Sequence, residues 1–117
     1  MLYKQFKELK LSSLGFGTMR LPLIPGGGEQ DIDQETLDRM VDCAIAGGVN
    51  YFDTAYPYHG GCSELAIGKS LARYPRESFY LADKFPGHQI VKGVKKLDPE
   101  TIFEEQLKKC GVEYFDF

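Results

Sequence analysis

The chain has 117 residues, with 14 Lys and Arg against 17 Asp and Glu, so its formal net charge is −3. Hydrophobic residues make up 43% and charged residues 26%, which is typical of a soluble globular domain, and the slight acidic excess argues against a nucleic-acid or membrane surface. No apolar run approaches the roughly 20 residues that span a bilayer, and no signal peptide is visible, so we expect a cytoplasmic protein. Three cysteines without a CxxC pair favour the same reducing compartment.

The first third of the sequence predicts short strands and a loop. Residues 3–12 alternate locally between apolar and polar and predict a hairpin, and residues 14–17 predict a short buried strand. Residues 22–28 are rich in Pro and Gly and predict a loop.

A helix is expected to begin at Asp33, which is a favourable N-cap residue, and to end at Gly47 and Gly48. Its apolar positions recur with helical spacing and predict a buried face made of Leu37, Met40, Val41, Ala44 and Ile45.

The rest of the chain alternates between predicted strands and helices. Residues 49–52 and 79–82 predict strands, with a helix between them that Ser63 should cap and that carries Ile67, Leu71 and Tyr74 on one face. Residues 86–97 predict an exposed loop or an irregular helix, in which Lys92, Lys95 and Lys96 face solvent. Asp98 and Pro99 begin a further helix that ends at Gly111 and buries Ile102, Phe103, Gln106, Leu107 and Cys110. Residues 112–117 predict one more strand.

This order of elements predicts an α/β fold with βα units around a parallel sheet. The length suits a single domain over residues 1–117, but it is under half of the roughly 250 residues of an eight-fold α/β barrel.

The residues expected to carry chemistry lie where the predicted strands end, because barrel active sites form at that edge. Asp53 and Lys84 follow two neighbouring strands, which should lie roughly 4.8 Å apart, so their side chains can pair. Tyr58, on the loop after Asp53, can fold back over that pair. A phenol is a poor acid at neutral pH, and a neighbouring ammonium group makes it a better proton donor.

Spacing alone leaves other interpretations of the polar residues open. Asp53 and Lys84 could form a structural ion pair, with Tyr58 as a half-buried loop aromatic. His59 could orient a substrate or be a solvated loop residue. The cysteines lack metal-ligand spacing, so no metal site is expected; Cys43 and Cys110 are interpreted as small core residues and Cys62 as a thiol that could be reactive. Gly68 is interpreted as a close-packing point between helix and sheet.

Several separated motifs resemble the aldo-keto reductase family over nearly the whole chain. They are Leu14-Gly15-Phe16-Gly17-Thr18-Met19-Arg20-Leu21-Pro22, then Asp53-Thr54-Ala55 with Tyr58, Gly60, Ser63-Glu64 and Gly68, and finally Lys84 at a strand end. The resemblance implies the N-terminal half of a (β/α)8 TIM barrel, preceded by a short β-hairpin. It also implies the oxidoreductase activity of the family, which is reduction of a carbonyl compound with NADPH; NADH is not excluded.

The resemblance assigns a role to each residue of the site. It implies Tyr58 as the proton donor, Lys84 as the cation that makes this donor more acidic, and Asp53 as the residue that orients Lys84. The stretch from Gly17 through Thr18 and Met19 to Arg20 resembles the segment on the nicotinamide side of the cofactor, and the resemblance implies that Asp53 also binds the cofactor. Tyr58 therefore takes the role of proton donor, and Tyr56 is expected to line the pocket of the site.

The sequence departs from the family pattern in one respect. The family tetrad also contains a histidine at the end of the fourth strand, a position that neither His59 nor His88 occupies. We therefore expect a fragment of a reductase that is weakly active or inactive alone. The sequence after Tyr58, His59-Gly60-Gly61, resembles a prokaryotic branch of the family that often carries a C-terminal iron–sulfur module. The alternative is a non-catalytic half-barrel that self-associates through its open edge, or that serves as a binding or regulatory module.

Overall fold

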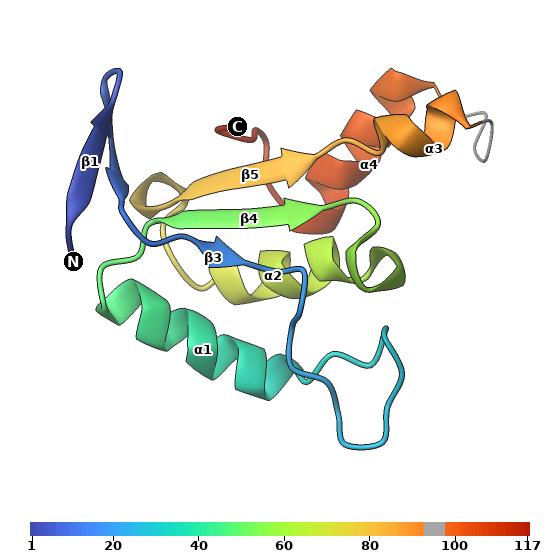
Figure 1. Cartoon of the computed structure of the whole chain (residues 1–117), viewed down its shortest axis with the longest axis horizontal. Helices are drawn as coiled ribbons and strands as arrows, with labels where there is room; N and C mark the ends of the chain where they lie inside the picture. The colour runs from blue at the N-terminus through green and yellow to red at the C-terminus, as the bar shows by residue number, and fades with distance from the viewer. Residues whose placement is uncertain (93–97) are drawn as a thin grey trace.

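The computed structural model describes residues 1–92 and 98–117. A β-hairpin of β1 (Tyr3–Phe6) and β2 (Leu9–Ser12) precedes a parallel sheet of β3 (Phe16–Gly17), β4 (Tyr51–Ala55) and β5 (Tyr80–Lys84), in the order β3-β4-β5 (Figure 1). The hairpin and the α/β order of the following elements agree with the sequence predictions.

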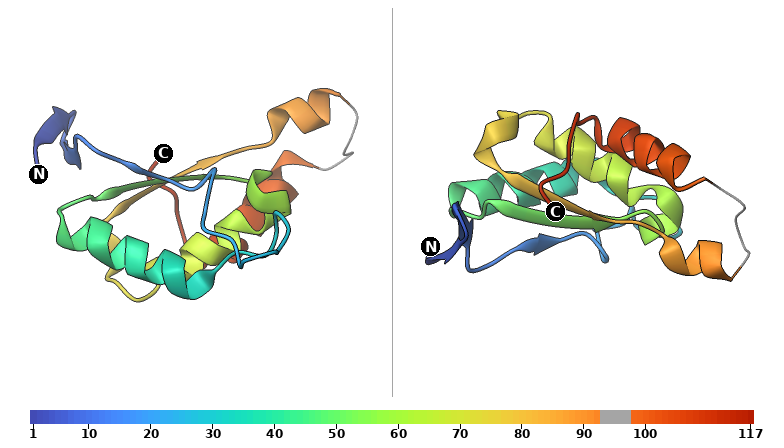
Figure 2. Two further views of the ribbon diagram at one scale, coloured as in Figure 1. Left: turned by 60° about the horizontal axis from the view of Figure 1, so that its bottom comes forward. Right: turned by 90° about the horizontal axis from the view of Figure 1, so that it is seen from above.

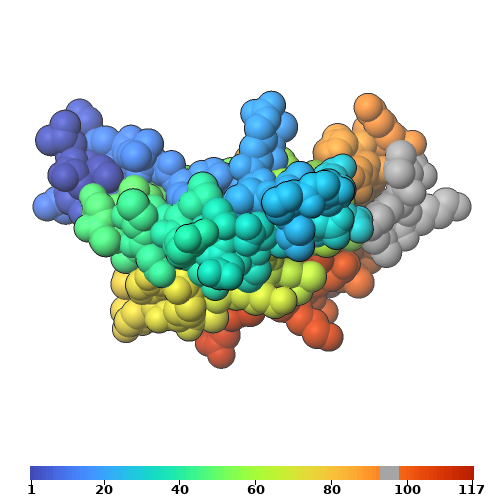
Figure 3. All heavy atoms as spheres, turned by 90° about the horizontal axis from the view of Figure 1, so that it is seen from below, coloured from blue at the N-terminus to red at the C-terminus, as the bar shows by residue number. Residues whose placement is uncertain are grey.

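Three helices cover one face of the parallel sheet. They are α1 (Gln34–Ala46), α2 (Ser63–Leu71) and α4 (Pro99–Cys110), and Figure 2 shows all three on the same side of the strands. The short helix α3 (Gly87–Val91) follows β5 and lies apart from this layer, beyond the end of the strand. The space-filling view in Figure 3 shows the hairpin and α3 projecting at opposite ends of the molecule. Single-turn 3₁₀ helices span Tyr58–Gly61 and Arg76–Ser78.

Local chemistry sets the ends of the two longest helices. The carboxylate of Asp33 accepts from Thr36 N at 3.0 Å, and Asp98 accepts in the same way from Thr101 N at 3.1 Å. Gly111 ends α4 in the left-handed conformation, with φ 66°, and Gly48 takes φ 90° just after α1. These boundaries confirm the predicted ones.

The core lies between the sheet and the helices. Phe52 of β4 and Leu81 of β5 are fully buried and contact the apolar faces of the helices. The largest fully buried apolar side chains from the helices are Leu37, Val41, Ile67, Leu71 and Ile102. Burial of this apolar area is the main force that holds the helices on the strands.

Several predicted faces and boundaries were wrong. Leu14, Met40, Cys43 and Phe103 are exposed rather than buried. The first three line one open groove and Phe103 lines another, and no described element fills either. β4 and β5 each begin one or two residues later than predicted and extend past their apolar residues, since backbone pairing continues from Asp53 to Ala55. The part of residues 86–97 that the structure describes contains α3, with Lys92 exposed, whereas Lys95 and Lys96 lie outside the described residues.

The predicted final strand is an extended segment instead. Asp116 N donates to Leu81 O at 2.9 Å, so residues 112–117 run beside β5. The Leu81 N–H, however, donates to the Asp116 carboxylate at 2.8 Å rather than to a backbone carbonyl. The guanidinium of Arg76 pairs with the same carboxylate at 2.7 Å. Backbone pairing resumes at the next residue, where Asp83 N donates to Phe117 O at 3.2 Å, so the segment follows β5 without forming a regular strand among the described residues.

Gly68 is a close-packing point, but between two helices rather than between helix and sheet. A Cβ atom at this position of α2 would lie 2.5 Å from the backbone oxygen of Cys110 at the end of α4. The backbones of α2 and α4 therefore approach each other as closely as they do because residue 68 has no side chain.

Replacement of Gly68 by alanine should lower the free energy of unfolding by about 1–3 kcal/mol, since α4 must move to accommodate the methyl group. Urea denaturation measures this loss. Lys69→Ala, at the neighbouring exposed position of α2, is the matched control and should stay close to the wild type. Equal stability of the two variants would contradict the packing account.

Candidate active site

The register of β4 and β5 places Asp53 and Lys84 on the same face of the sheet. Asp53 lies opposite Ala82, and Ala55 lies opposite Lys84. Because side chains alternate along a strand, Phe52 and Thr54 point into the helix layer, where both are fully buried. Asp53 and Lys84 consequently point away from the helices, at the end of the sheet where β4 and β5 terminate.

The ammonium of Lys84 lies between a carboxylate and a phenol. Its Nζ donates to Asp53 Oδ1 and, at 3.2 Å, to the backbone oxygen of Thr54, and it lies 5.1 Å from the centroid of the Tyr58 ring. Partial burial lowers the pKa of Lys84, but its contacts with Asp53 and Tyr58 outweigh that effect and raise it overall. The structure thus brings together the three side chains that the sequence singled out, with the lysine charged at neutral pH.

Tyr58 lies at the start of a turn in which the next three residues have positive φ angles. The residues that follow it, His59, Gly60 and Gly61, have φ of 54°, 59° and 90°. The imidazole of His59 holds this turn, because Leu21 N donates to its Nε2 at 2.9 Å and its Nδ1 lies 2.8 Å from Glu29 O. An acceptor Nε2 leaves the ring proton on Nδ1, which donates to Glu29 O. His59 is therefore buried and bonded through both nitrogens, rather than solvated as one interpretation held.

A buried chain of hydroxyl groups supports the end of β4. Ser63 Oγ lies 2.8 Å from Thr18 Oγ1 and 2.9 Å from Thr54 Oγ1, and Thr18 also donates to Asp53 O from both its N and its Oγ1 at 3.0 Å. Ser63 was predicted as the N-cap of α2, which is wrong: it is the first residue of the helix, and Cys62 is the cap. The hydroxyl that would have capped α2 is instead bonded to Thr18 and Thr54.

The four residues predicted on the cofactor side lie beside this chain of hydroxyls. Gly17 pairs with Asp53 in the β3–β4 register, and Thr18 is fully buried. Met19 and Arg20 follow at the end of β3 with exposed side chains. A contact of any of these residues with a cofactor stays a prediction.

The sequence analysis missed a buried polar cluster behind Lys84. Glu64 of α2 is fully buried; its two carboxylate oxygens accept from Gln106 at 3.0 Å and from Lys109 at 2.7 Å, both on α4. The signals in the sequence were a glutamine on the apolar face of the last predicted helix and an acidic residue, Asp83, directly after the predicted strand 79–82. Glu64 lies in the first turn of α2, and the sequence analysis assigned it no partner on another element.

Asp83 belongs to the same cluster. Its Oδ1 is buried and has no hydrogen-bond donor among the described residues. Burial, together with a hydrogen bond to Glu64 and the charge of that residue, raises the pKa of Asp83 to about 8. The nearby Cys110 thiol is buried, and this burial and the charges of Asp83 and Glu64 raise its pKa, whereas Cys62 is partly exposed and its reactivity stays a prediction.

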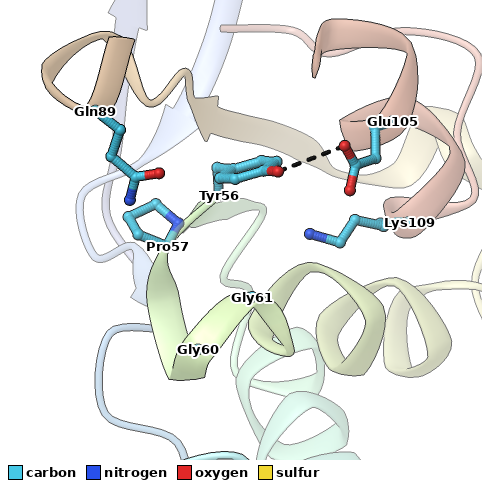
Figure 4. Close-up of a pocket in the computed structure, with 7 residues that line it drawn as sticks. All are labelled: Tyr56, Pro57, Gly60, Gly61, Gln89, Glu105 and Lys109. Atoms are coloured by element: carbon cyan, nitrogen blue, oxygen red, sulfur yellow. Dashed lines mark hydrogen bonds between the residues drawn. The ribbon is translucent and has the colours of Figure 1, made fainter. Parts of the chain in front are cut away.

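A polar pocket of about 420 Å³ opens on the outer side of the Tyr58 loop. It is lined by Tyr56, Pro57, Gly60, Gly61, Gln89, Glu105 and Lys109 (Figure 4). The Tyr56 hydroxyl donates to Glu105 Oε2 at 3.4 Å, and Lys109 Nζ lies 4.5 Å from the centroid of its ring. Tyr56 thus contacts two residues of α4 and lines a pocket that does not include Asp53, Tyr58 or Lys84. Its place in the pocket of the site stays a prediction.

Comparison with known proteins decides the family. The model of the aldo/keto reductase family matches residues 13–117, which is most of the chain. The chain belongs to the aldo/keto reductase family. It is 32% identical over 112 residues to the protein named "Probable aldo-keto reductase 1" of Glycine max, and 31% identical over 126 residues to the NADH-specific methylglyoxal reductase of Escherichia coli K12. These matches cover 92% and 93% of this chain.

A solved relative shows how the fold of this aldo/keto reductase chain relates to a whole barrel. The thermostable aldo-keto reductase Tm1743, solved with the inhibitor epalrestat, superimposes with a TM-score of 0.73 at 30% identity. The match covers 99% of this chain and 41% of that one. The chain also spans about a third of the two curated relatives, 32% and 37% of their lengths. Its fold is therefore that of the N-terminal part of a (β/α)8 barrel with a hairpin in front.

The raised pKa of Asp83 predicts how stability depends on pH. The folded state keeps a proton that the unfolded chain, with an ordinary pKa of 3.8, releases, so this contribution is complete below about pH 4 and is lost as the pH rises to about 8. The free energy of unfolding of the wild type should fall across that range, by at most about 1.4 kcal/mol per pH unit for one proton.

Asp83→Asn replaces the protonated carboxyl by a neutral amide and should flatten this dependence. Urea denaturation from pH 5 to pH 8 compares the two proteins, with Asp31→Asn in an exposed loop as the control that keeps the wild-type slope. Parallel curves for wild type and Asp83→Asn would refute a buried proton at this residue.

Proposed function

We propose that the chain carries the Asp–Tyr–Lys part of an NAD(P)H-dependent carbonyl reductase site, acting on an aldehyde or ketone. The observation that carries this proposal is the Lys84 ammonium, bonded to Asp53 and lying against the ring of Tyr58 at the ends of adjacent parallel strands. Membership of the aldo/keto reductase family and the likeness to a relative named as a methylglyoxal reductase support the reaction class.

Each of the three side chains has one task in this reaction. Tyr58 donates its phenolic proton to the carbonyl oxygen as negative charge develops there. Lys84 stabilises the phenolate that is left, and Asp53 holds the lysine in place. The phenolate then regains a proton from solvent, so that one hydride and one proton have been added to the carbonyl.

The residues at the end of β3 fit the nicotinamide side of a cofactor. Met19 and Arg20 expose an apolar and a cationic side chain just beyond Gly17, which pairs with Asp53. When bound, the dihydronicotinamide would supply the hydride. Because one relative is named as NADH-specific, the proposal includes both NADPH and NADH as cofactors. The chain spans about a third of each curated relative, so its own activity is to be tested by experiment.

Hydride transfer from deuterated cofactor tests the proposal. The chain is incubated at high concentration with [4-²H]NADPH or [4-²H]NADH and a panel of aldehydes, and the deuterated alcohol is measured by mass spectrometry, which detects very slow turnover. Tyr58→Phe and Lys84→Met should each form at least about 100-fold less product than the wild type, since loss of a positioned proton donor typically costs that much.

Tyr80→Phe is the matched control, because it removes a phenol from β5 while leaving the three residues intact. Equal product from wild type, Tyr58→Phe and Lys84→Met would remove the assigned roles. Absence of product from the wild type would show that the chain does not catalyse the reaction alone.

One observation favours a second candidate, which is association of the chain through its open edge. β3 is the edge strand of the parallel sheet, and beside it lies an apolar groove of about 480 Å³. The groove is lined by Met1, Leu14, Gly15, Phe16, Met40, Cys43, Ala44, Gly47 and Val49. An open strand edge next to an apolar groove is a surface that another βα unit could cover, and we propose that a second copy of the chain does so.

Sedimentation velocity over a dilution series should then show a dimer that dissociates on dilution. Met40→Asp places a charge in the groove and should weaken association at least about tenfold, which corresponds to 1.4 kcal/mol. Leu65→Asp, at a similarly exposed position on α2, should leave it unchanged. A monomer at every concentration would contradict this candidate.

A further inference from the structure

Gln106 is a buried amide on the face of α4 that packs against α2. Only 2% of the residue is exposed, and it lies one helical turn from Ile102 and Cys110, both of which are buried. A buried amide is costly unless its hydrogen bonds are made, so the partners of Gln106 indicate what it holds.

The amide nitrogen of Gln106 donates to two oxygens on different elements. Nε2 lies 3.0 Å from Oε1 of Glu64 on α2 and 3.2 Å from the backbone oxygen of Lys84 at the end of β5. A carboxylate and a carbonyl can only accept hydrogen bonds, so the orientation of the amide follows from its partners. One side chain therefore joins α2, α4 and the last residue of β5.

The backbone oxygen of Lys84 has a second donor from the other side. Tyr56 N, just after β4, donates to it at 3.2 Å. Beyond Lys84 the chain leaves the sheet through Phe85 and Pro86, and proline has no N–H with which to continue the ladder. The bond from Gln106 consequently holds the strand where its pairing with β4 ends, at the residue that carries the ammonium.

Glu64 is itself held, so it provides a rigid anchor for Gln106. Its other carboxylate oxygen is paired with Lys109, and Asp83 contacts it from β5. The same turn of α4 also contacts Tyr56, two residues before Tyr58: Glu105 accepts from its hydroxyl, and Lys109 lies over its ring (Figure 4). α4 thus contacts both segments that carry the groups of the site.

From these contacts we infer that Gln106 is a positioning residue, which fixes the main chain at Lys84 and so keeps the ammonium between Asp53 and Tyr58. The role of Gln106 in catalysis rests on the proposed function. The position of the Lys84 ammonium, however, can be measured without turnover.

The test is Gln106→Met, which keeps the length of the side chain and removes both donors. The pH titration of the Lys84 ¹³Cε resonance, in protein labelled with ¹³C-lysine, reports the surroundings of the ammonium. In the wild type the midpoint should lie above 10.5, the ordinary pKa of lysine, because Asp53 and Tyr58 raise the pKa of Lys84. In Gln106→Met the midpoint should fall toward 10.5 as those contacts loosen.

Ile102→Val is the matched control, since it removes a buried methylene from the same face of α4 without touching Lys84. It should lower the melting temperature and leave the Lys84 midpoint in place. A folded Gln106→Met protein with the wild-type midpoint would overturn the inference, because a purely structural role predicts that outcome.

A measurement on the wild type covers the case in which Gln106→Met does not fold. The side-chain amide protons of Gln106 should exchange with solvent at least about tenfold more slowly than those of Gln5 in the exposed hairpin, since they are buried and bonded. Equal exchange rates would overturn the inference. Neither experiment depends on hydride transfer, so the inference and the proposed function can fail separately.

Discussion

The parallel register of β4 and β5 is the constraint on which the site depends. Phe52 and Leu81 lie opposite each other and are both fully buried against the helices, so the apolar core determines the register. With that register fixed, Asp53 and Lys84 emerge on the opposite face, close enough for the carboxylate to bond the ammonium. A slip of one residue in β5 would turn Lys84 into the helix layer and bring Asp83 to the site. The hydrophobic core thus decides the position of the charges.

Two polar networks inside the helix layer hold the ends of these strands. The hydroxyls of Thr18, Ser63 and Thr54 bond one another and the backbone of Asp53, and the carboxylate of Glu64 is paired with Gln106 and Lys109. A buried carboxylate destabilises a fold unless both of its oxygens are satisfied, and both oxygens of Glu64 are, whereas Oδ1 of Asp83 in the same cluster has no donor among the described residues. Satisfied networks of this kind restrict the backbone to one arrangement, which a purely apolar contact does less well.

The predictions that held depend either on neighbouring residues or on the shared edge of parallel strands. Asp33 and Asp98 cap helices because a carboxylate and an amide three residues on meet in any helix start, and Gly111 ends α4 because its conformation is left-handed. The meeting of Asp53, Tyr58 and Lys84 could be predicted because parallel strand ends share one edge. The contacts of Ser63, His59 and Glu64 could not be predicted for one reason: their partners Thr18, Leu21 and Lys109 are 38 or more residues away in sequence. Local preference offers no information on such contacts.

The Asp53–Lys84 ion pair is too exposed to contribute much to the stability of the fold. The side chains are 32% and 50% exposed, and an ion pair in that setting contributes about 0–1 kcal/mol to folding. The pair therefore adds little to the stability of the sheet, and the core beneath it would determine the same register without it. The structure nevertheless bonds the backbone beside both residues, through Thr18 at Asp53 and through Gln106 at Lys84. The ion pair stabilises the fold only weakly, yet the backbone beside each of its residues is held by a hydrogen bond. A role in positioning Lys84 next to the Tyr58 phenol explains this arrangement better than a role in stability.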